Sequence, residues 1–219
     1  MSFPKVAIIA GGTGLVGRHV IEHLVKDSFF DKIYVLNRRT VDYDSGKVHE
    51  IIVDFEDLSP SLVGIQPTHA FCTLGTTIKK AGSREAFRKV DQEYVMNFAL
   101  AVFSLGCKNF NVVTALGTNK ASSIFYNQVK FEVSQSLEKV GFEQLNIIQP
   151  SLLLGDREEK RLGEDIMQLL FKYTRTLWAG PLKNVAGIQG SQVAKAMVAI
   201  AKKERKGVYR IQSRNLHSY

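Results

Sequence analysis

Short apolar runs alternate with longer segments of helical spacing along the whole chain. The apolar runs are rich in β-branched residues, as buried strands are. They fall at Val6–Ala10, Lys32–Leu36, Val48–Val53, His69–Leu74, Asn109–Thr114, Leu145–Gln149 and near Val208–Ile211. Strands that alternate with helices predict right-handed crossovers and a doubly wound parallel sheet with helices on both faces, an α/β fold.

Between the runs, apolar residues recur every three or four positions, which is the period of an amphipathic helix. Such faces begin at Leu15, at Tyr94 and at Val129. After Gln149 the pattern loosens, and a further helix is expected around Asp165–Leu177. We therefore predict one domain over residues 1–219, with a small substrate-side loop and helix at about residues 150–180.

The first strand runs into a glycine-rich loop of the form G-x-x-G-x-x-G, with glycines at 11, 14 and 17. In a strand–loop–helix unit, the first glycine permits the tight turn, the second lets the backbone approach a pyrophosphate, and the third lets the helix pack on the strand. The helix start adds free amide groups and partial positive charge. The loop predicts a dinucleotide site made by Gly11, Thr13, Gly14, Leu15, Val16 and Gly17. The alternative is a glycine turn that serves packing only.

The end of the second strand bears on the choice of cofactor. An NAD site usually has an acidic residue there, which accepts from the ribose 2′-hydroxyl. This chain has Asn37, Arg38 and Arg39 instead. Two guanidinium groups suit a 2′-phosphate, so the sequence favours NADP(H) over NAD(H). The alternative is that both arginines belong to a solvated turn.

Asp54 follows the third strand, where a carboxylate could accept from the adenine amino group. An Asx turn or a helix cap would use the same residue type. Both interpretations stay open.

Tyr126 and Lys130 lie four residues apart on a predicted helix after the fifth strand. Hydride transfer to a carbonyl needs a proton donor, and a tyrosine serves near neutral pH only if a cation stabilises its phenolate. Tyr43 and Lys47 share this spacing but lie in a turn, so we attribute that match to chance. Thr114, at the end of the fifth strand, is the candidate third catalytic group, and ordinary strand-end capping is its alternative.

The motifs together resemble a short-chain dehydrogenase/reductase, and more closely the Tat-interacting-protein oxidoreductases and their bacterial NAD(P)-binding relatives. The resemblance runs from about Val6 to Trp178. Its residues are Val53–Phe55, Cys72–Thr77, Lys80–Gly82, Phe87–Asp91, Tyr126–Lys130 and Pro150–Arg157, with Arg161, Gly163 and Glu164. It implies a Rossmann-like sheet of order 3-2-1-4-5-6, to which the run near Val208–Ile211 would add a seventh strand.

The resemblance also implies bound NADP(H), with Tyr126 and Lys130 in the catalytic positions and among the residues that contact the cofactor. It implies that Leu74, Gly75 and Thr76 line the cofactor after the fourth strand. One departure matters, because the family usually has two serines where this chain has Thr114 and Ala115. Whether the catalytic triad is complete depends on which of those two hydroxyls the reaction uses.

Composition and motif content limit the classes of partner that this protein could bind. The 219 residues are 45% hydrophobic and carry a net charge of +8, which suits an acidic partner. No apolar run reaches the roughly 20 residues of a membrane span, and no nucleic-acid reader motif is present. We expect neither of those partners and no metal. Two cysteines give no disulfide framework, so we expect a cytoplasmic protein, either a monomer or a homodimer.

Two functions follow from these observations. The first is an NADP(H)-dependent oxidoreductase that acts on a small carbonyl-type substrate of unknown identity. The second is a non-catalytic NADP(H)-binding regulator that reports redox state to a protein partner, which the Thr114–Ala115 departure favours.

Overall fold

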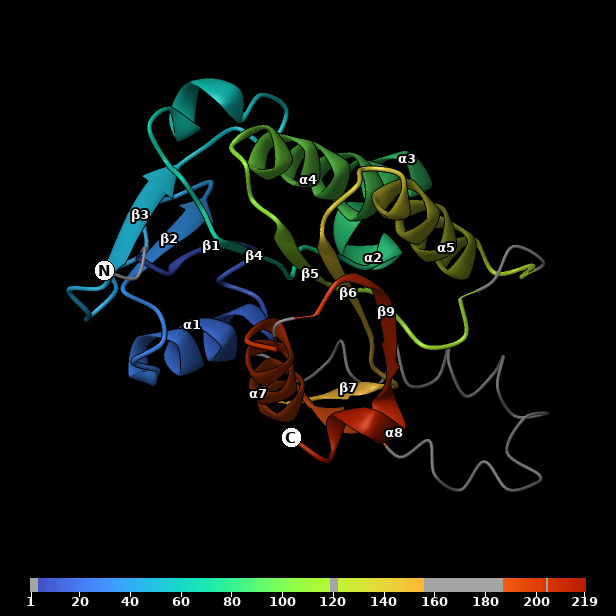
Figure 1. The fold of residues 1–219 in the computed structure, drawn as a ribbon. Helices are drawn as coiled ribbons and strands as arrows, with labels where there is room; N and C mark the ends of the chain where they lie inside the picture. The colour runs from blue at the N-terminus through green and yellow to red at the C-terminus, as the bar shows by residue number, and fades with distance from the viewer. Residues whose placement is uncertain (1–3, 119–121, 156–186, 204) are drawn as a thin grey trace.

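A computed structural model describes residues 4–118, 122–155, 187–203 and 205–219 (Figure 1). Its main sheet has the order β3-β2-β1-β4-β5-β6-β9, and every neighbouring pair is parallel. The strands are β1 (Val6–Ala10), β2 (Lys32–Asn37), β3 (Val48–Ile52), β4 (His69–Cys72), β5 (Asn109–Val113), β6 (Gln144–Gln149) and β9 (Gly207–Gln212). The predicted doubly wound fold, its strand order and its seventh strand are confirmed.

Helices cover both faces of this sheet (Figure 1). One face carries α1 (Gly17–Lys26) and α7 (Gly190–Ala201), and the other carries α4 (Tyr94–Ser104) and α5 (Phe125–Glu138). Short elements complete the described chain. They are a 3-10 turn (Ser59–Leu62), α2 (Ile78–Ala81), α3 (Arg84–Arg88), a π-helical turn (Lys89–Glu93), α8 (Ser213–Leu216) and a parallel pair, β7 (Leu153–Leu154) with β8 (Ile188–Gln189).

Alternate residues of the central strands pack into two separate hydrophobic cores, one on each face of the sheet. In β1, Ala7 and Ile9 pack toward α1 and α7, while Ile8 and Ala10 pack toward α4 and α5. Both faces of these strands are mainly apolar, as expected for parallel strands covered on both sides, although β5 and β6 also bury the polar residues Asn109, Asn111, Gln144 and Asn146. Among the described residues, no helix is both long and apolar enough to cross a membrane.

Three strands end earlier than predicted. Val53, Leu74 and Thr114 lie just beyond their strands, where the chain turns into the loops of the carboxyl edge. Leu100, which fits the apolar spacing of the helix that begins at Tyr94, is 53% exposed. The helix predicted around Asp165–Leu177, and most of the loop and helix at about 150–180, lie outside the described residues.

His69 begins β4 as a buried polar residue. Its ring meets the edges of Phe29 and Phe30, and its Nδ1 lies 2.8 Å from Thr68 Oγ1. Burial disfavours the charged imidazolium and Lys5 adds to the effect, so the pKa of His69 is lowered to about 4 although the Ala201 carbonyl opposes the shift. His69 is therefore neutral in the folded protein at physiological pH.

This burial predicts an acid-sensitive contribution to stability. The folded pKa lies below the unfolded value of 6.5, so protons bind His69 more readily in the unfolded chain. The contribution is complete above about pH 6.5 and is lost as the pH falls toward 4, by an amount on the order of 3 kcal/mol. Urea unfolding of wild type and of His69→Gln across that range should give a shallower pH dependence for the variant, and equal slopes would contradict this assignment.

Candidate cofactor and active site

The glycine loop makes a cradle between β1, α1 and the end of β4. Gly11 has φ +89°, and a Cβ on it would lie 2.7 Å from the carbonyl carbon of Thr73. A Cβ on Gly17 would lie 2.1 Å from the Gly11 oxygen, and Gly14 N donates to that same oxygen at 3.0 Å. Only glycine fits at positions 11 and 17, so the predicted close packing of loop, helix and strand is present.

Two residues of this cradle were missed by the sequence analysis. Thr73 Oγ1 donates to the carbonyl oxygens of Ala10 and Gly11 at 3.1 and 3.0 Å, which ties β4 to the loop. Gly12 is also closely packed, since a Cβ there would lie 2.8 Å from the end of the Ile21 side chain, which would have to move. The second glycine of the Gly11–Gly12 pair was the signal that could have indicated it.

The remaining loop residues divide between surface and interior. Thr13 is exposed and Val16 is buried. Leu15 reaches toward the start of α7, because a Cβ on Gly190 would lie 2.9 Å from Leu15 Cγ. Thr13 is therefore the loop side chain most open to a ligand.

A polar network lies at the end of β2. Asn37 is buried, and its amide donates to Tyr43 Oη at 2.9 Å and to Glu50 Oε1 at 2.6 Å. The Arg38 and Arg39 side chains that follow are exposed. Sequence analysis missed Glu50 and dismissed Tyr43, although the Tyr43 hydroxyl lies 3.5 Å from a Cβ built on Gly12. The network anchors the loop that carries both arginines beside the glycine cradle.

Asp54 is exposed beyond β3, and its Oδ1 accepts from the Glu56 amide at 2.9 Å. The Asx-turn alternative is therefore present in the structure. A contact between Asp54 and an adenine stays a prediction.

Lys130 lies inside the protein, one turn along α5 from Tyr126. Its Nζ lies 2.7 Å from Asp91 Oδ1, and the two side chains are 5% and 1% exposed. The other Asp91 oxygen accepts from the Thr76 amide at 2.8 Å. A Cβ on Gly75 would lie 3.4 Å from the Asp91 carboxylate and 3.8 Å from Lys130 Nζ. The structure thus brings Gly75, Thr76 and Lys130 together around a carboxylate that was absent from the predicted site.

The charges of this cluster depend on one another. Burial, the largest single effect, lowers the pKa of Lys130, but the Asp91 carboxylate and Tyr126 together outweigh it, so the pKa of Lys130 is raised. Lys130 therefore stays an ammonium although it is buried. Tyr126 is half-buried, with its ring centroid 5.6 Å from that of Phe87. These positions give Tyr126 a permanent cation on the neighbouring turn of its own helix.

Thr114 is turned toward the backbone. It is 4% exposed, and both its amide and its hydroxyl donate to the Ile148 carbonyl, at 2.8 and 3.3 Å. This is the strand-end arrangement that the sequence left as its alternative.

Comparisons with known proteins come from curated relatives and solved structures, and no family model matches the chain. Protein HTATIP2 of Rattus norvegicus is 34% identical over 179 residues, which cover 80% of this chain and 74% of the relative. The chain belongs to the HTATIP2 family. This confirms the resemblance to Tat-interacting-protein oxidoreductases.

Fungal and structural relatives extend the HTATIP2 comparison. FMP52, a protein of Eremothecium gossypii named mitochondrial, is 30% identical and covers 94% of this chain and 92% of its own. A short-chain dehydrogenase/reductase from Burkholderia thailandensis superposes with a TM-score of 0.70 at 14% identity, over 99% of this chain and 94% of its own. WbmG of Bordetella bronchiseptica, solved in complex with NAD, superposes with a TM-score of 0.66 at 14% identity. The match covers 95% of this chain and 73% of WbmG. These structures show the Rossmann-like fold of NAD(P)-binding oxidoreductases.

The predicted cytoplasmic location is wrong by this comparison, because HTATIP2-family relatives from several fungi are named mitochondrial. The prediction rested on cysteine usage. Both cysteines are free and buried, and a reducing interior of either compartment permits that state equally.

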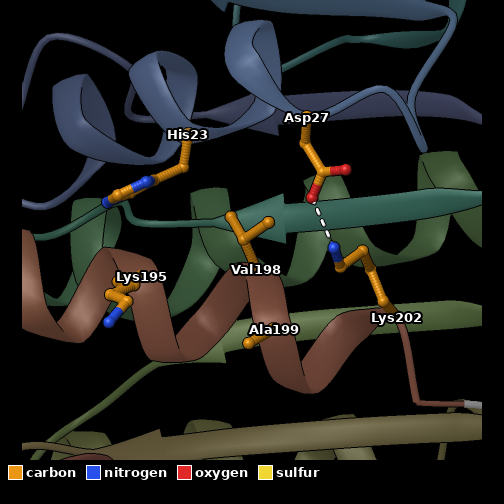
Figure 2. A pocket seen from close by; sticks show the side chains of 6 residues that line it. All are labelled: His23, Asp27, Lys195, Val198, Ala199 and Lys202. Atoms are coloured by element: carbon orange, nitrogen blue, oxygen red, sulfur yellow. Dashed lines mark hydrogen bonds and ion pairs between the residues drawn. The ribbon is translucent and has the colours of Figure 1, made fainter. Parts of the chain in front are cut away.

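A second hollow lies apart from this site, between α1 and α7. It is a surface pocket of about 160 Å³ lined by His23, Asp27, Lys195, Val198, Ala199 and Lys202 (Figure 2). An ion pair of 2.5 Å between Asp27 and Lys202 joins the two helices at this pocket. None of the predicted site residues lines it. Within the described ranges, no three His, Cys, Asp or Glu side chains gather as metal ligands would.

The cradle predicts a sharp difference between two glycines. Gly17→Ala should lower the free energy of unfolding by about 2 kcal/mol or more, because its methyl group has no room beside the Gly11 oxygen. Gly46→Ala is the matched control, since a Cβ there meets nothing within 4 Å. Urea unfolding of both variants gives the comparison, and equal stabilities would refute the assigned packing.

Proposed function

We propose that this chain is an NADP(H)-dependent oxidoreductase that transfers a hydride to or from a small carbonyl-type substrate. The observation that carries the proposal is the buried Lys130 ammonium, which lies one helical turn from Tyr126 and directly below the Gly75 backbone. A lysine kept charged in the interior beside a tyrosine serves an acid–base role better than a structural one.

The residues around the cradle fit a dinucleotide. The space that a Cβ on Gly11 or Gly17 would fill is already occupied by backbone, so the loop presents its amides at the start of α1 for phosphate oxygens. Leu74, Gly75 and Thr76 would lie along the nicotinamide half. Lys130 uses one of its three N–H donors on Asp91, which leaves donors for ribose hydroxyls.

The bound nicotinamide would supply or accept the hydride. Tyr126 would give a proton to the substrate oxygen in reduction and take it back in oxidation. Lys130 would make this exchange practicable, because its ammonium favours the phenolate and so lowers the pKa at which Tyr126 exchanges its proton. Thr114 would contribute at most to the shape of the pocket, since its hydroxyl donates to Ile148.

Arg38 and Arg39 support NADP(H) over NAD(H). Both guanidinium groups are exposed at the carboxyl end of β2, on a loop held by Glu50, which accepts from the Val41 amide at 2.8 Å. Arginine side chains form charge-assisted hydrogen bonds with phosphate, which a 2′-hydroxyl cannot match.

The second candidate is a regulator that binds NADP(H) without turnover and reports redox state to a protein partner. The contact between Thr114 and Ile148, with Ala115 beside it, favours this function because it leaves the triad without a free strand-end hydroxyl. A monomer or a homodimer is compatible with either function.

The catalytic proposal predicts the effect of removing one hydroxyl. Tyr126→Phe should lower turnover of NADPH with a panel of carbonyl compounds by about 100-fold or more, because it removes the proton donor. NADPH affinity by calorimetry should fall by less than about 10-fold, the value of one hydrogen bond. Tyr34→Phe, which alters a tyrosine in the middle of β2, is the control. Equal turnover by wild type and Tyr126→Phe would refute the role of Tyr126, and binding without turnover in wild type would support the regulator.

The cofactor preference predicts a selective loss. Arg38→Ala with Arg39→Ala should weaken NADPH binding by about 10- to 100-fold, the value of one or two charge-assisted contacts. NADH binding should change little, because it lacks the 2′-phosphate. Lys108→Ala removes a cation that pairs with Glu143 near the start of β5 and serves as the charge control. Parallel loss of both affinities would contradict the assignment.

A further inference from the structure

The helix after β4 contains a π-helical turn at Lys89–Glu93, between α3 and α4. Such turns add a residue to a helix and occur frequently at functional sites. Here the turn carries Asp91, whose carboxylate is 1% exposed, toward α5. A buried carboxylate needs a charged or hydrogen-bonding partner. The turn brings Asp91 to Lys130 of α5, which the proposed reaction also uses.

Asp91 joins three elements at one point. Through its two oxygens it contacts Lys130 Nζ on α5 and the Thr76 amide after β4. The exposed Gly75 backbone lies over the ion pair. The carboxylate therefore orients the lysine and the loop expected to line the cofactor, without lying in the cofactor's own path.

We propose that Asp91 is a positioning residue that sets the acid strength of Tyr126 by partly cancelling the charge of Lys130. The proposal rests on the proposed function, because it assigns a control over the same tyrosine. An ammonium alone acts on the Tyr126 hydroxyl as a full positive charge. An ammonium 2.7 Å from a carboxylate acts as a dipole, whose field at the hydroxyl is weaker.

Other titratable side chains lie near the pair or near Tyr126. Cys72 on β4 is buried, which raises its pKa to about 12, so it stays a neutral thiol. Arg88 is paired with Glu132 of α5 at a more exposed position, where solvent screens both charges. Arg84 lies over the ring of Phe125, with its guanidinium carbon 5.3 Å from the centroid.

The direct test measures Tyr126 itself. Tyrosinate absorbance is followed against pH in the cofactor-free protein, and the Tyr126→Phe titration is subtracted to isolate Tyr126. Asp91→Asn should lower the pKa of Tyr126 by about one unit, because the lysine charge then acts uncancelled. Glu93→Gln, which removes an exposed carboxylate from the same turn, is the matched control and should leave the titration unchanged.

A double variant covers the case in which Asp91→Asn does not fold, since it leaves a buried charge unpaired. Asp91→Asn with Lys130→Met removes both charges and leaves neither partner alone. Its Tyr126 pKa should lie above wild type by less than about two units if Asp91 already cancels part of the lysine charge. A rise of about two units or more would show that Lys130 acts with its full charge, and it would overturn the proposal.

Turnover gives an independent readout. Oxidation needs the phenolate, so the acidic limb of the kcat/KM profile should move to lower pH in Asp91→Asn by the same amount as the titration. If wild type shows no turnover, the proposed enzymatic function is refuted, and the titration still decides the role of Asp91. An unmoved Tyr126 titration with a loss of stability alone would make Asp91 a structural residue.

Discussion

The buried ion pair of Asp91 and Lys130 is the interaction on which the carboxyl edge of this sheet depends. Removing two charges from water costs several kcal/mol each, and their attraction offsets this only in good geometry with further hydrogen bonds. The 2.7 Å contact and the Thr76 amide provide these conditions. The pair therefore persists only when the π-helical turn, α5 and the loop after β4 are all in place, so it reports that the site is assembled.

The rest of the site depends on close packing. Thr73 binds two carbonyl oxygens at the end of β1, and Gly11 and Gly17 leave no room for a side chain between those elements. Strands end where the loops must turn to make these contacts, so the carboxyl edge is defined by close packing and not by side-chain polarity. A ligand at this edge meets backbone amides and a buried cation that are positioned before it arrives.

Sequence was sufficient for the features that depend on local pattern. Strand order follows from alternating periods and crossover handedness, and the glycine loop follows from spacing after a strand. The role of Asp91 in the site was not predicted, because a π-helical turn has no periodic signal in the sequence. The role of Glu50 was not predicted because its partner Asn37 is 13 residues away in sequence. Thr114 was recognised by position, but only its contact with Ile148 shows where the hydroxyl points. Residue types could be predicted, whereas their pairing depended on tertiary structure.

Binding and catalysis are separable in this architecture. The cradle of Gly11, Gly12 and Gly17 owes nothing to Tyr126, so a dinucleotide can be held whether or not the tyrosine exchanges a proton. The proposed control of Tyr126 lies instead in the Asp91–Lys130 pair. A change of one residue in that pair leaves the other charge buried and unpaired, so it lowers the stability of the fold as well as altering the proposed acid strength of Tyr126. The two functions proposed above therefore share the cradle and differ in whether Tyr126 exchanges a proton, which in our proposal depends on the charge balance around Lys130 and on the Thr114 hydroxyl.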